Sequence, residues 1–104
     1  MSLKEAQKEV HELLSQYKVP YWTPHEILAR LAEETGEVAR EVNHTYGPKK
    51  KKPGEKEGSV GEEMADVIFT ICCMANSLRI DLDEHWKKVI EKGYERDKDR
   101  FERN

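Results

Sequence analysis

The sequence predicts an all-α fold of about four helices in a single domain over residues 1–104. Apolar residues recur at helical spacing in four segments, and strand-like alternation persists nowhere. Charged residues make up 38% of the chain and hydrophobic residues only 37%, which is little apolar material for a buried core. We therefore expect a small helical bundle whose core is completed by oligomerisation.

The first predicted helix covers residues 2–17. Pro20 disfavours helical backbone in the residue before it, so this helix must end ahead of the segment 18–22. The apolar positions that recur at helical spacing are Leu3, Ala6, Val10, Leu13, Leu14 and Tyr17.

The second predicted helix has the clearest start in the chain. Thr23 is a favourable N-cap, Pro24 suits the first helical position, and Glu26 completes a capping box. The helix should end near residues 46–48, where glycine and proline follow a tyrosine. Its apolar stripe consists of Ile27, Leu28, Leu31, Val38 and Val42.

A basic linker follows the second helix at residues 46–59. It contains two prolines, three glycines and five lysines, among them the run Lys49–Lys52, so we expect it to be flexible. The linker carries a net charge of +3 and the rest of the chain −6. The formal net charge of −3 excludes a basic nucleic-acid-binding surface over the whole chain.

The third predicted helix begins at Ser59, with Glu62 as its capping-box partner. Its apolar residues occupy nearly every side, a pattern typical of a helix that is buried on several faces. In so small a protein this pattern indicates contact with a second chain. The apolar residues are Val60, Met64, Val67, Ile68, Phe69, Ile71, Cys72, Met74 and Leu78.

The fourth predicted helix begins at Asp81, and Glu84 stands three residues later as in the other capping boxes. Trp86, Val89, Ile90 and Tyr94 supply its apolar contacts. Three basic residues, Lys92, Arg96 and Arg100, recur every four positions and can share one face of the helix.

The two cysteines, Cys72 and Cys73, are adjacent within an apolar run. Adjacent cysteines make a poor disulfide and offer no zinc-ligand spacing, so we expect buried free thiols. The longest apolar run, residues 67–75, is too short to cross a membrane, and no signal peptide is visible. A cytoplasmic location is the expectation that follows.

Two acidic pairs carry the functional interpretation. Glu34 and Glu37 form one pair, Glu63 and Asp66 the other, and 25 residues separate them. Residues three apart lie on the same face of a helix, so two adjacent helices would bring four carboxylates to one place. Four such charges repel one another unless a cation lies between them. Carboxylates without cysteine or histidine favour Mg²⁺, with Mn²⁺ possible, over zinc.

Magnesium commonly shares its coordination with substrate phosphates, so the pattern favours metal-dependent attack of water on a phosphoryl group. Acidic pairs on helices are, however, often only a solvated face. A helical oligomer that binds a nucleotide or metal without turnover, and a plain interaction protein, therefore remain alternatives. A di-iron bundle requires two Glu-x-x-His motifs, and the chain has one, from Glu41 to His44.

The segments that contain these pairs resemble a known family. Residues 31–38 followed by residues 62–67 look like the MazG nucleoside triphosphate pyrophosphohydrolases, particularly the short single-domain MazG-like proteins of Bacillus-type bacteria. That closer likeness extends to residues 39–44, 75–78 and 96–100.

The resemblance implies an α-helical dimer or tetramer that cleaves nucleoside triphosphates between the α- and β-phosphates. The products would be a nucleoside monophosphate and pyrophosphate, in housekeeping of the nucleotide pool. By motif, the metal ligands and catalytic residues would be Glu34, Glu37, Glu63 and Asp66. Lys92 fits the position of a basic residue that contacts the phosphates, and Arg96 follows one turn later.

Three further residues are candidates for substrate binding. His44 follows Glu37 by about two helical turns and either lines a base pocket or faces water. Trp22 either stacks on a base or packs at the helix junction. Asn76 either contacts the nucleotide or makes an interface hydrogen bond.

Overall fold

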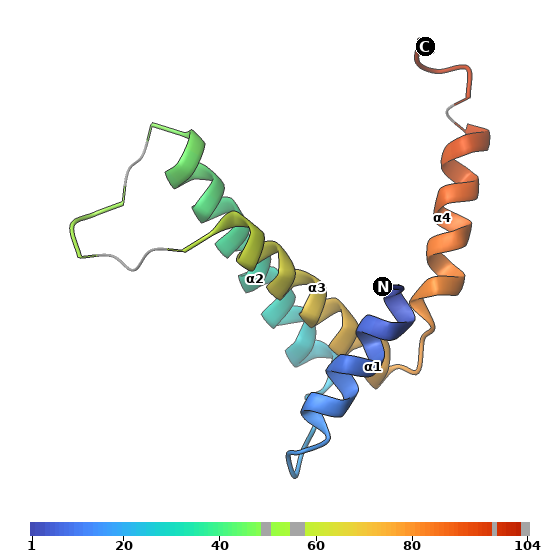
Figure 1. Cartoon of the computed structure of the whole chain (residues 1–104), viewed down its shortest axis with the longest axis horizontal. Coiled ribbons are helices and arrows are strands. Elements are labelled where there is room, and N and C mark those ends of the chain that lie inside the picture. The colour runs from blue at the N-terminus through green and yellow to red at the C-terminus, as the bar shows by residue number, and fades with distance from the viewer. Residues whose placement is uncertain (49–50, 55–57, 97, 103–104) are drawn as a thin grey trace.

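The computed structural model contains four α-helices in the order α1 (Leu3–Leu14), α2 (Pro24–Tyr46), α3 (Val60–Ser77) and α4 (Leu82–Arg96) (Figure 1). The structure describes residues 1–48, 51–54, 58–96 and 98–102. No strand occurs within these ranges, and the prediction of an all-α fold with four helices is confirmed.

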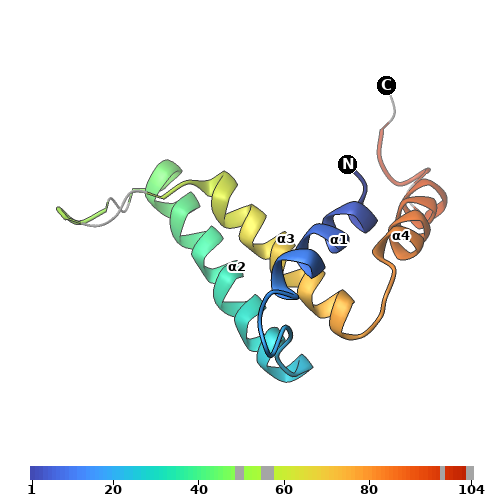
Figure 2. The same ribbon diagram turned by 60° about the horizontal axis from the view of Figure 1, so that its bottom comes forward.

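Helices α2 and α3 form an antiparallel pair and run side by side in both views (Figures 1 and 2). Helix α1 packs against α3 near the end of the pair that lies away from the basic linker. Helix α4 packs against α1 and stands apart from the α2–α3 pair. Helix α4 thus projects away from the α2–α3 pair.

Side-chain caps explain why three of the helices begin where they do. The hydroxyl of Thr23 accepts from the backbone N–H of Glu26, and the Glu26 carboxylate accepts from the backbone N–H of Thr23. The hydroxyls of Ser2 and Ser59 likewise accept the backbone N–H three residues later. Each cap satisfies helix-terminal donors that otherwise lack a partner. The predicted starts at Thr23 and Ser59 are confirmed.

Helix α1 ends at Leu14, three residues before the predicted end. The backbone N–H of Tyr17 bonds to the carbonyl of Leu14 at 3.0 Å, a tighter turn than the α-helical pattern. Tyr17 is 61% exposed, so its side chain does not pack in the core. Because helices in proteins are stabilised mainly by such packing, a further helical turn up to Tyr17 would gain little stability.

The start of α4 is tied both to its own cap and to α1. Asp81 Oδ1 accepts from the backbone N–H of Asp83 at 3.0 Å, which confirms Asp81 as the cap of this helix. The Asp83 carboxylate in turn accepts from the backbone N–H groups of Leu3 and Lys4, at 3.1 and 3.3 Å. A negative charge at the N-terminus of α1 also complements the helix dipole.

A polar network joins α1 to the α3–α4 connection. Gln7 is 8% exposed, and its Nε2 donates to Asn76 Oδ1 at 3.0 Å and to the carbonyl of Ile80 at 2.8 Å. Its Oε1 accepts from the backbone N–H of Leu82 at 3.0 Å. The Asn76 amide donates to the carbonyl of Gln7 and to the Tyr21 hydroxyl. Buried amides of this kind are stable only when their bonding groups find partners.

The apolar core of the single chain is small. Among the described residues only Val10, Ile27, Cys72 and Ala75 are buried hydrophobic residues. Helix α4 buries no residue, and its Trp86 is 57% exposed. The Cα radius of gyration is 17.3 Å, whereas a compact chain of this length has about 13 Å. Much apolar surface is thus left uncovered by the chain's own packing.

Two other predictions concern the linker and the cysteines. Lys49 and Lys50, half of the predicted basic run, lie outside the described residues. Both cysteines are free thiols; Cys72 is buried as predicted, while Cys73 is only partly buried. Among the described residues, no helix is both long enough and apolar enough to span a membrane.

Candidate metal centre and adjoining cavity

Three of the four predicted metal ligands meet where α2 and α3 pack together. Glu34 comes from α2, and Glu63 and Asp66 come from the first two turns of α3. One carboxylate oxygen from each residue lies within 4.8 Å of the others. Oxygen donors at this separation suit a hard divalent cation such as Mg²⁺.

The electrostatics of the cluster also favour a cation. Partial burial raises the pKa of Glu63, and the charges of Asp66, Glu37 and Glu34 raise it further. A raised carboxyl pKa means that the ionised form is disfavoured where it stands. A divalent cation would reverse that penalty, so the donor set fits the group that the sequence pattern predicts.

Glu37, the fourth predicted ligand, is near the cluster without joining it. It lies one turn beyond Glu34 on α2, and its side chain is 48% exposed. Its Oε2 is 4.0 Å from Nη1 of Arg40, at the outer limit of an ion pair. The charge of Glu37 is nevertheless close enough to contribute to the raised pKa of Glu63.

Glu41 is a carboxylate for which the sequence predicted no role. It lies one turn beyond Glu37, is 7% exposed, and its Oε1 is 3.3 Å from Nζ of Lys51. A Cβ atom on Gly58 would stand 2.7 Å from the same oxygen, so the linker approaches Glu41 closely. The sequence signal was present, because Glu41 shares the helical sector of Glu34 and Glu37, but its partner in the linker could not be inferred.

Arg30 is the second residue that sequence reasoning missed. It precedes Glu34 by one helical turn, and its Nε donates to Glu34 Oε1 at 2.7 Å. The spacing of four residues between opposite charges is the available signal. It passes unnoticed because such pairs are common on helix surfaces.

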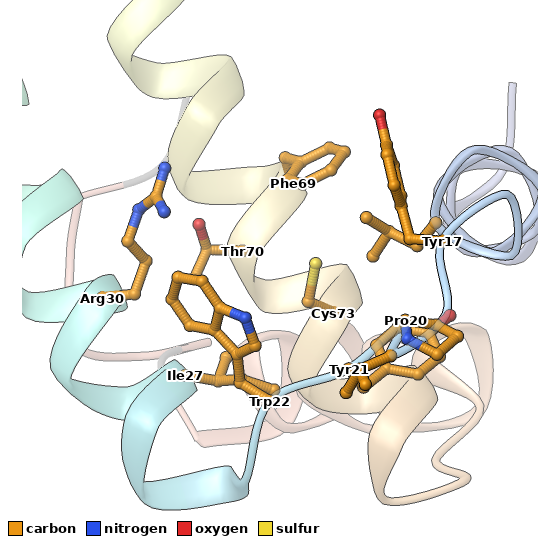
Figure 3. Close-up of a pocket in the computed structure, with 11 residues that line it drawn as sticks. Tyr17, Pro20, Tyr21, Trp22, Ile27, Arg30, Phe69, Thr70 and Cys73 are labelled. Carbon is orange, nitrogen blue, oxygen red and sulfur yellow. The ribbon is translucent and has the colours of Figure 1, made fainter.

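A cavity of about 390 Å³ lies next to the carboxylate cluster. The segment 17–22, the start of α2 and the later turns of α3 enclose it (Figure 3). Arg30 and Thr70 belong to its lining, and each is one helical turn from a ligand of the cluster. Its volume lies within the range of small-molecule sites. The full lining is Leu14, Tyr17, Val19, Pro20, Tyr21, Trp22, Ile27, Arg30, Phe69, Thr70 and Cys73.

Trp22 is the predicted substrate residue that lies in this cavity. It immediately precedes the N-cap of α2, and Ile27 is the fourth residue of the helix, so the two occupy the positions of a hydrophobic staple. Both side chains line the cavity, as Figure 3 shows. The packing and substrate-binding interpretations of Trp22 are therefore compatible.

The other predicted substrate residues lie elsewhere. His44 is in the last turn of α2, and its Nδ1 is buried without a hydrogen-bond partner among the described residues. Asn76 is engaged with Gln7 and Tyr21, an internal use of its amide. Lys92 and Arg96 lie on α4, which projects away from the α2–α3 pair (Figure 1).

Comparison with known proteins places this arrangement in a family. The family model for the MazG nucleotide pyrophosphohydrolase domain matches residues 22–101. The uncharacterised protein YpjD of Bacillus subtilis (strain 168) is 48% identical over 102 residues, which cover 98% of this chain and 92% of that protein.

Two crystal structures are similar in both sequence and fold, each with a TM-score of 0.78. One is Bacillus subtilis YPJD, provisionally named a pyrophosphatase; it is 47% identical, and the match covers 88% of this chain and 94% of that chain. The other is the Bacillus-conserved MazG protein, a nucleotide pyrophosphohydrolase, at 46% identity with 95% and 96% covered. On the family match, the sequence identity and the shared fold, the chain belongs to the MazG nucleotide pyrophosphohydrolase family.

Proposed function

We propose that this protein is a Mg²⁺-dependent pyrophosphohydrolase that converts nucleoside or deoxynucleoside triphosphates to monophosphates and pyrophosphate. The observation that carries the proposal is the adjacency of two features. The carboxylates of Glu34, Glu63 and Asp66 meet one helical turn from the cavity lined by Trp22. A metal and a nucleoside would thereby be held next to one another. Membership of the family supports the same reaction.

The chain's own residues define the chemistry. Glu34, Glu63 and Asp66 would hold the ion, with Glu37 as the fourth carboxylate of the set. Bound Mg²⁺ would neutralise charge that develops on the phosphoryl oxygens. Water attacks the α-phosphorus, the bond from that phosphorus to the bridging oxygen breaks, and pyrophosphate leaves. A carboxylate of the acidic set accepts the proton that the water loses.

The nucleoside end of the substrate would occupy the cavity. The Trp22 ring offers a face on which any base can stack. The Thr70 hydroxyl donates to the carbonyl of Asp66 at 2.9 Å, which fixes that side chain beside the cluster. Asn76 would act on the same cavity through the Tyr21 hydroxyl, to which its amide donates at 3.2 Å. His44 lies away from this cavity, in the last turn of α2, and its buried Nδ1 is not placed to contact a nucleoside there.

We further propose that the working form is a homodimer or homotetramer in which α4 reaches the site of another copy. Lys92 and Arg96 would then contact phosphates that their own chain does not bring near them. Two observations support this: α4 projects away from the α2–α3 pair, and it buries none of its apolar residues within the chain. Apolar surface left exposed on this scale is typical of a protein interface.

The test is a product assay with a panel of ribo- and deoxyribonucleoside triphosphates in Mg²⁺. Monophosphate and pyrophosphate should appear in equal amounts, and Asp66→Asn should reduce the rate by a hundredfold or more, as expected for loss of an electrostatic contact to the reacting group (about 10²-fold or greater). Glu62→Gln, which removes a neighbouring exposed carboxylate, serves as the matched control and should retain the rate. Release of orthophosphate in place of pyrophosphate contradicts the proposed reaction. Thermal stabilisation by nucleotide with Mg²⁺, without any product, would instead establish a binding module.

A further inference from the structure

Arg30 is the residue that touches both halves of the proposed site. Its Nε donates to Glu34 Oε1 at 2.7 Å on the side of the metal centre. On the other side its guanidinium carbon lies 5.8 Å from the centre of the Trp22 ring, a cation–π contact. Figure 3 shows the Arg30 and Trp22 side chains together at one end of the cavity.

The contact with Glu34 is partly protected from water. The Arg30 side chain is 50% exposed, but that of Glu34 is only 13% exposed. The hydrogen bond that Arg30 donates to Glu34 raises the pKa of Arg30, and the charges of Glu34, Glu33 and Asp66 act in the same direction. Arg30 therefore neutralises part of the charge of the acidic cluster.

The position of the Trp22 ring is set independently of Arg30. The capping box of Thr23 and Glu26 fixes the backbone directly after Trp22. Ile27 supports the ring from the fourth position of the helix. Because the ring is fixed in this way, the position of the Arg30 guanidinium over it depends on the hydrogen bond that Arg30 donates to Glu34.

We propose that Arg30 is a positioning residue that couples occupancy of the metal centre to the cavity. This inference rests on the metal site of the proposed function. A divalent cation and Arg30 compete for the same Glu34 carboxylate, because both are positively charged and Glu34 Oε1 already accepts from Nε. Metal loading weakens the hold of Glu34 on Arg30 and frees the guanidinium to move from its position 5.8 Å from the Trp22 ring further into the cavity. An incoming nucleotide then meets a free cation only when the metal is present.

The chain allows a direct spectroscopic test, since it contains only two tryptophans. Trp86→Phe leaves Trp22 as the sole indole, and its emission is followed during titration with Mg²⁺. In this background the emission should change and saturate. Arg30→Met should abolish the change and bind Mg²⁺ roughly two- to fivefold more tightly by calorimetry, because a competing ion pair of this partly exposed kind has been removed.

Arg40→Met is the matched control. It removes the same charge from the same helix, beside Glu37, but Arg40 is not part of the cavity lining. It should retain the emission change. Arg30→Lys keeps the positive charge but lacks the planar guanidinium, so it should give a smaller emission change. This variant tests the inference if Arg30→Met does not fold.

The inference is overturned if Arg30→Met keeps the emission change, if its Mg²⁺ affinity equals that of its parent, or if Arg40→Met behaves identically to it. An Arg30→Lys variant with the full emission change also overturns it. Absence of any binding heat in the parent protein overturns both this inference and the proposed metal site. A metal-dependent emission change in a protein that releases no pyrophosphate supports the role of Arg30 and contradicts only the proposed reaction.

Discussion

The α2–α3 pair and helix α4 differ in how extensively each packs against the rest of the chain. Helices α2 and α3 run along one another and bring the carboxylates of Glu34, Glu63 and Asp66 together within one chain. Helix α4 buries none of its residues and is joined to the rest through its first turn, by polar contacts to α1. A single chain thus brings the acidic residues of the proposed site together, whereas its α4 carries Lys92 and Arg96 away from the α2–α3 pair. Three predictions, given in order of expected effect, test this difference.

The largest effect is expected from complementation between two inactive variants. Asp66→Asn removes the acidic half, and Lys92→Met combined with Arg96→Met removes the basic half. If α4 serves the site of a partner, a randomly mixed dimer should contain intact sites and recover about a quarter of wild-type activity. The measurement is pyrophosphate release by differently tagged, coexpressed chains.

The control for this experiment pairs Asp66→Asn with Glu63→Gln, two variants that damage the same half. No mixture of these can assemble an intact site, so activity should stay at the level of either parent. No recovery in the first pair would show that Lys92 and Arg96 act within their own chain or not at all. Recovery in the control pair would show that the acidic set itself is divided between chains.

The second prediction concerns the attachment of α4. Gln7→Ala should lower the free energy of unfolding by roughly 1–3 kcal/mol, because the amide of Asn76 and the backbone N–H of Leu82 lose a buried partner. Urea unfolding gives the value. Gln16→Ala is the control, since the Gln16 side chain makes an exposed bond to the carbonyl of Leu13, and it should change the stability far less.

The smallest effect is expected at Glu63 in the metal-free protein. Its pKa is raised above the usual value of 4.5 by partial burial and then by the neighbouring carboxylates. The folded state therefore binds this proton more tightly than the unfolded state does. The stabilisation is present below the unfolded pKa and is lost as pH rises through the folded pKa.

Glu63→Gln should therefore raise the melting temperature of the metal-free protein at pH 7 to 8 and flatten its dependence on pH above 4.5. Adding Mg²⁺ should stabilise the wild type more than the variant, because a ligand of the folded state has been removed. Differential scanning calorimetry measures both effects. An equal gain from Glu62→Gln would mean that net charge, and not the cluster, is responsible.

Much of the fold could be predicted because its signals are local. The helix starts at Thr23 and Ser59 depend on side chains that cap backbone groups three residues away, and both were predicted correctly. The four-helix architecture follows from the apolar spacing between these starts. The predicted end of α1 was wrong, because apolar spacing alone does not show that Tyr17 lacks a packing partner.

The candidate site was predictable only in part. The spacing of Glu34, Glu63 and Asp66 was sufficient to nominate them, and the structure brings these three together. No pattern in the sequence connects Asn76 with Gln7, which is 69 residues away. Nor does any pattern connect Glu41 with Lys51, or Arg30 with Trp22, since these contacts depend on how the linker and the loop before α2 fold back.

The sequence by itself determined where the helices begin, which carboxylates share a helical face and which family the chain resembles. Each of these rests on interactions within about one helical turn. Only the tertiary structure decided that three carboxylates meet at the α2–α3 contact while Glu37 stands beside them, that a cavity adjoins them, and that α4 lies apart. The physical reason is that helix packing is set by contacts summed over distant residues, which local spacing does not specify.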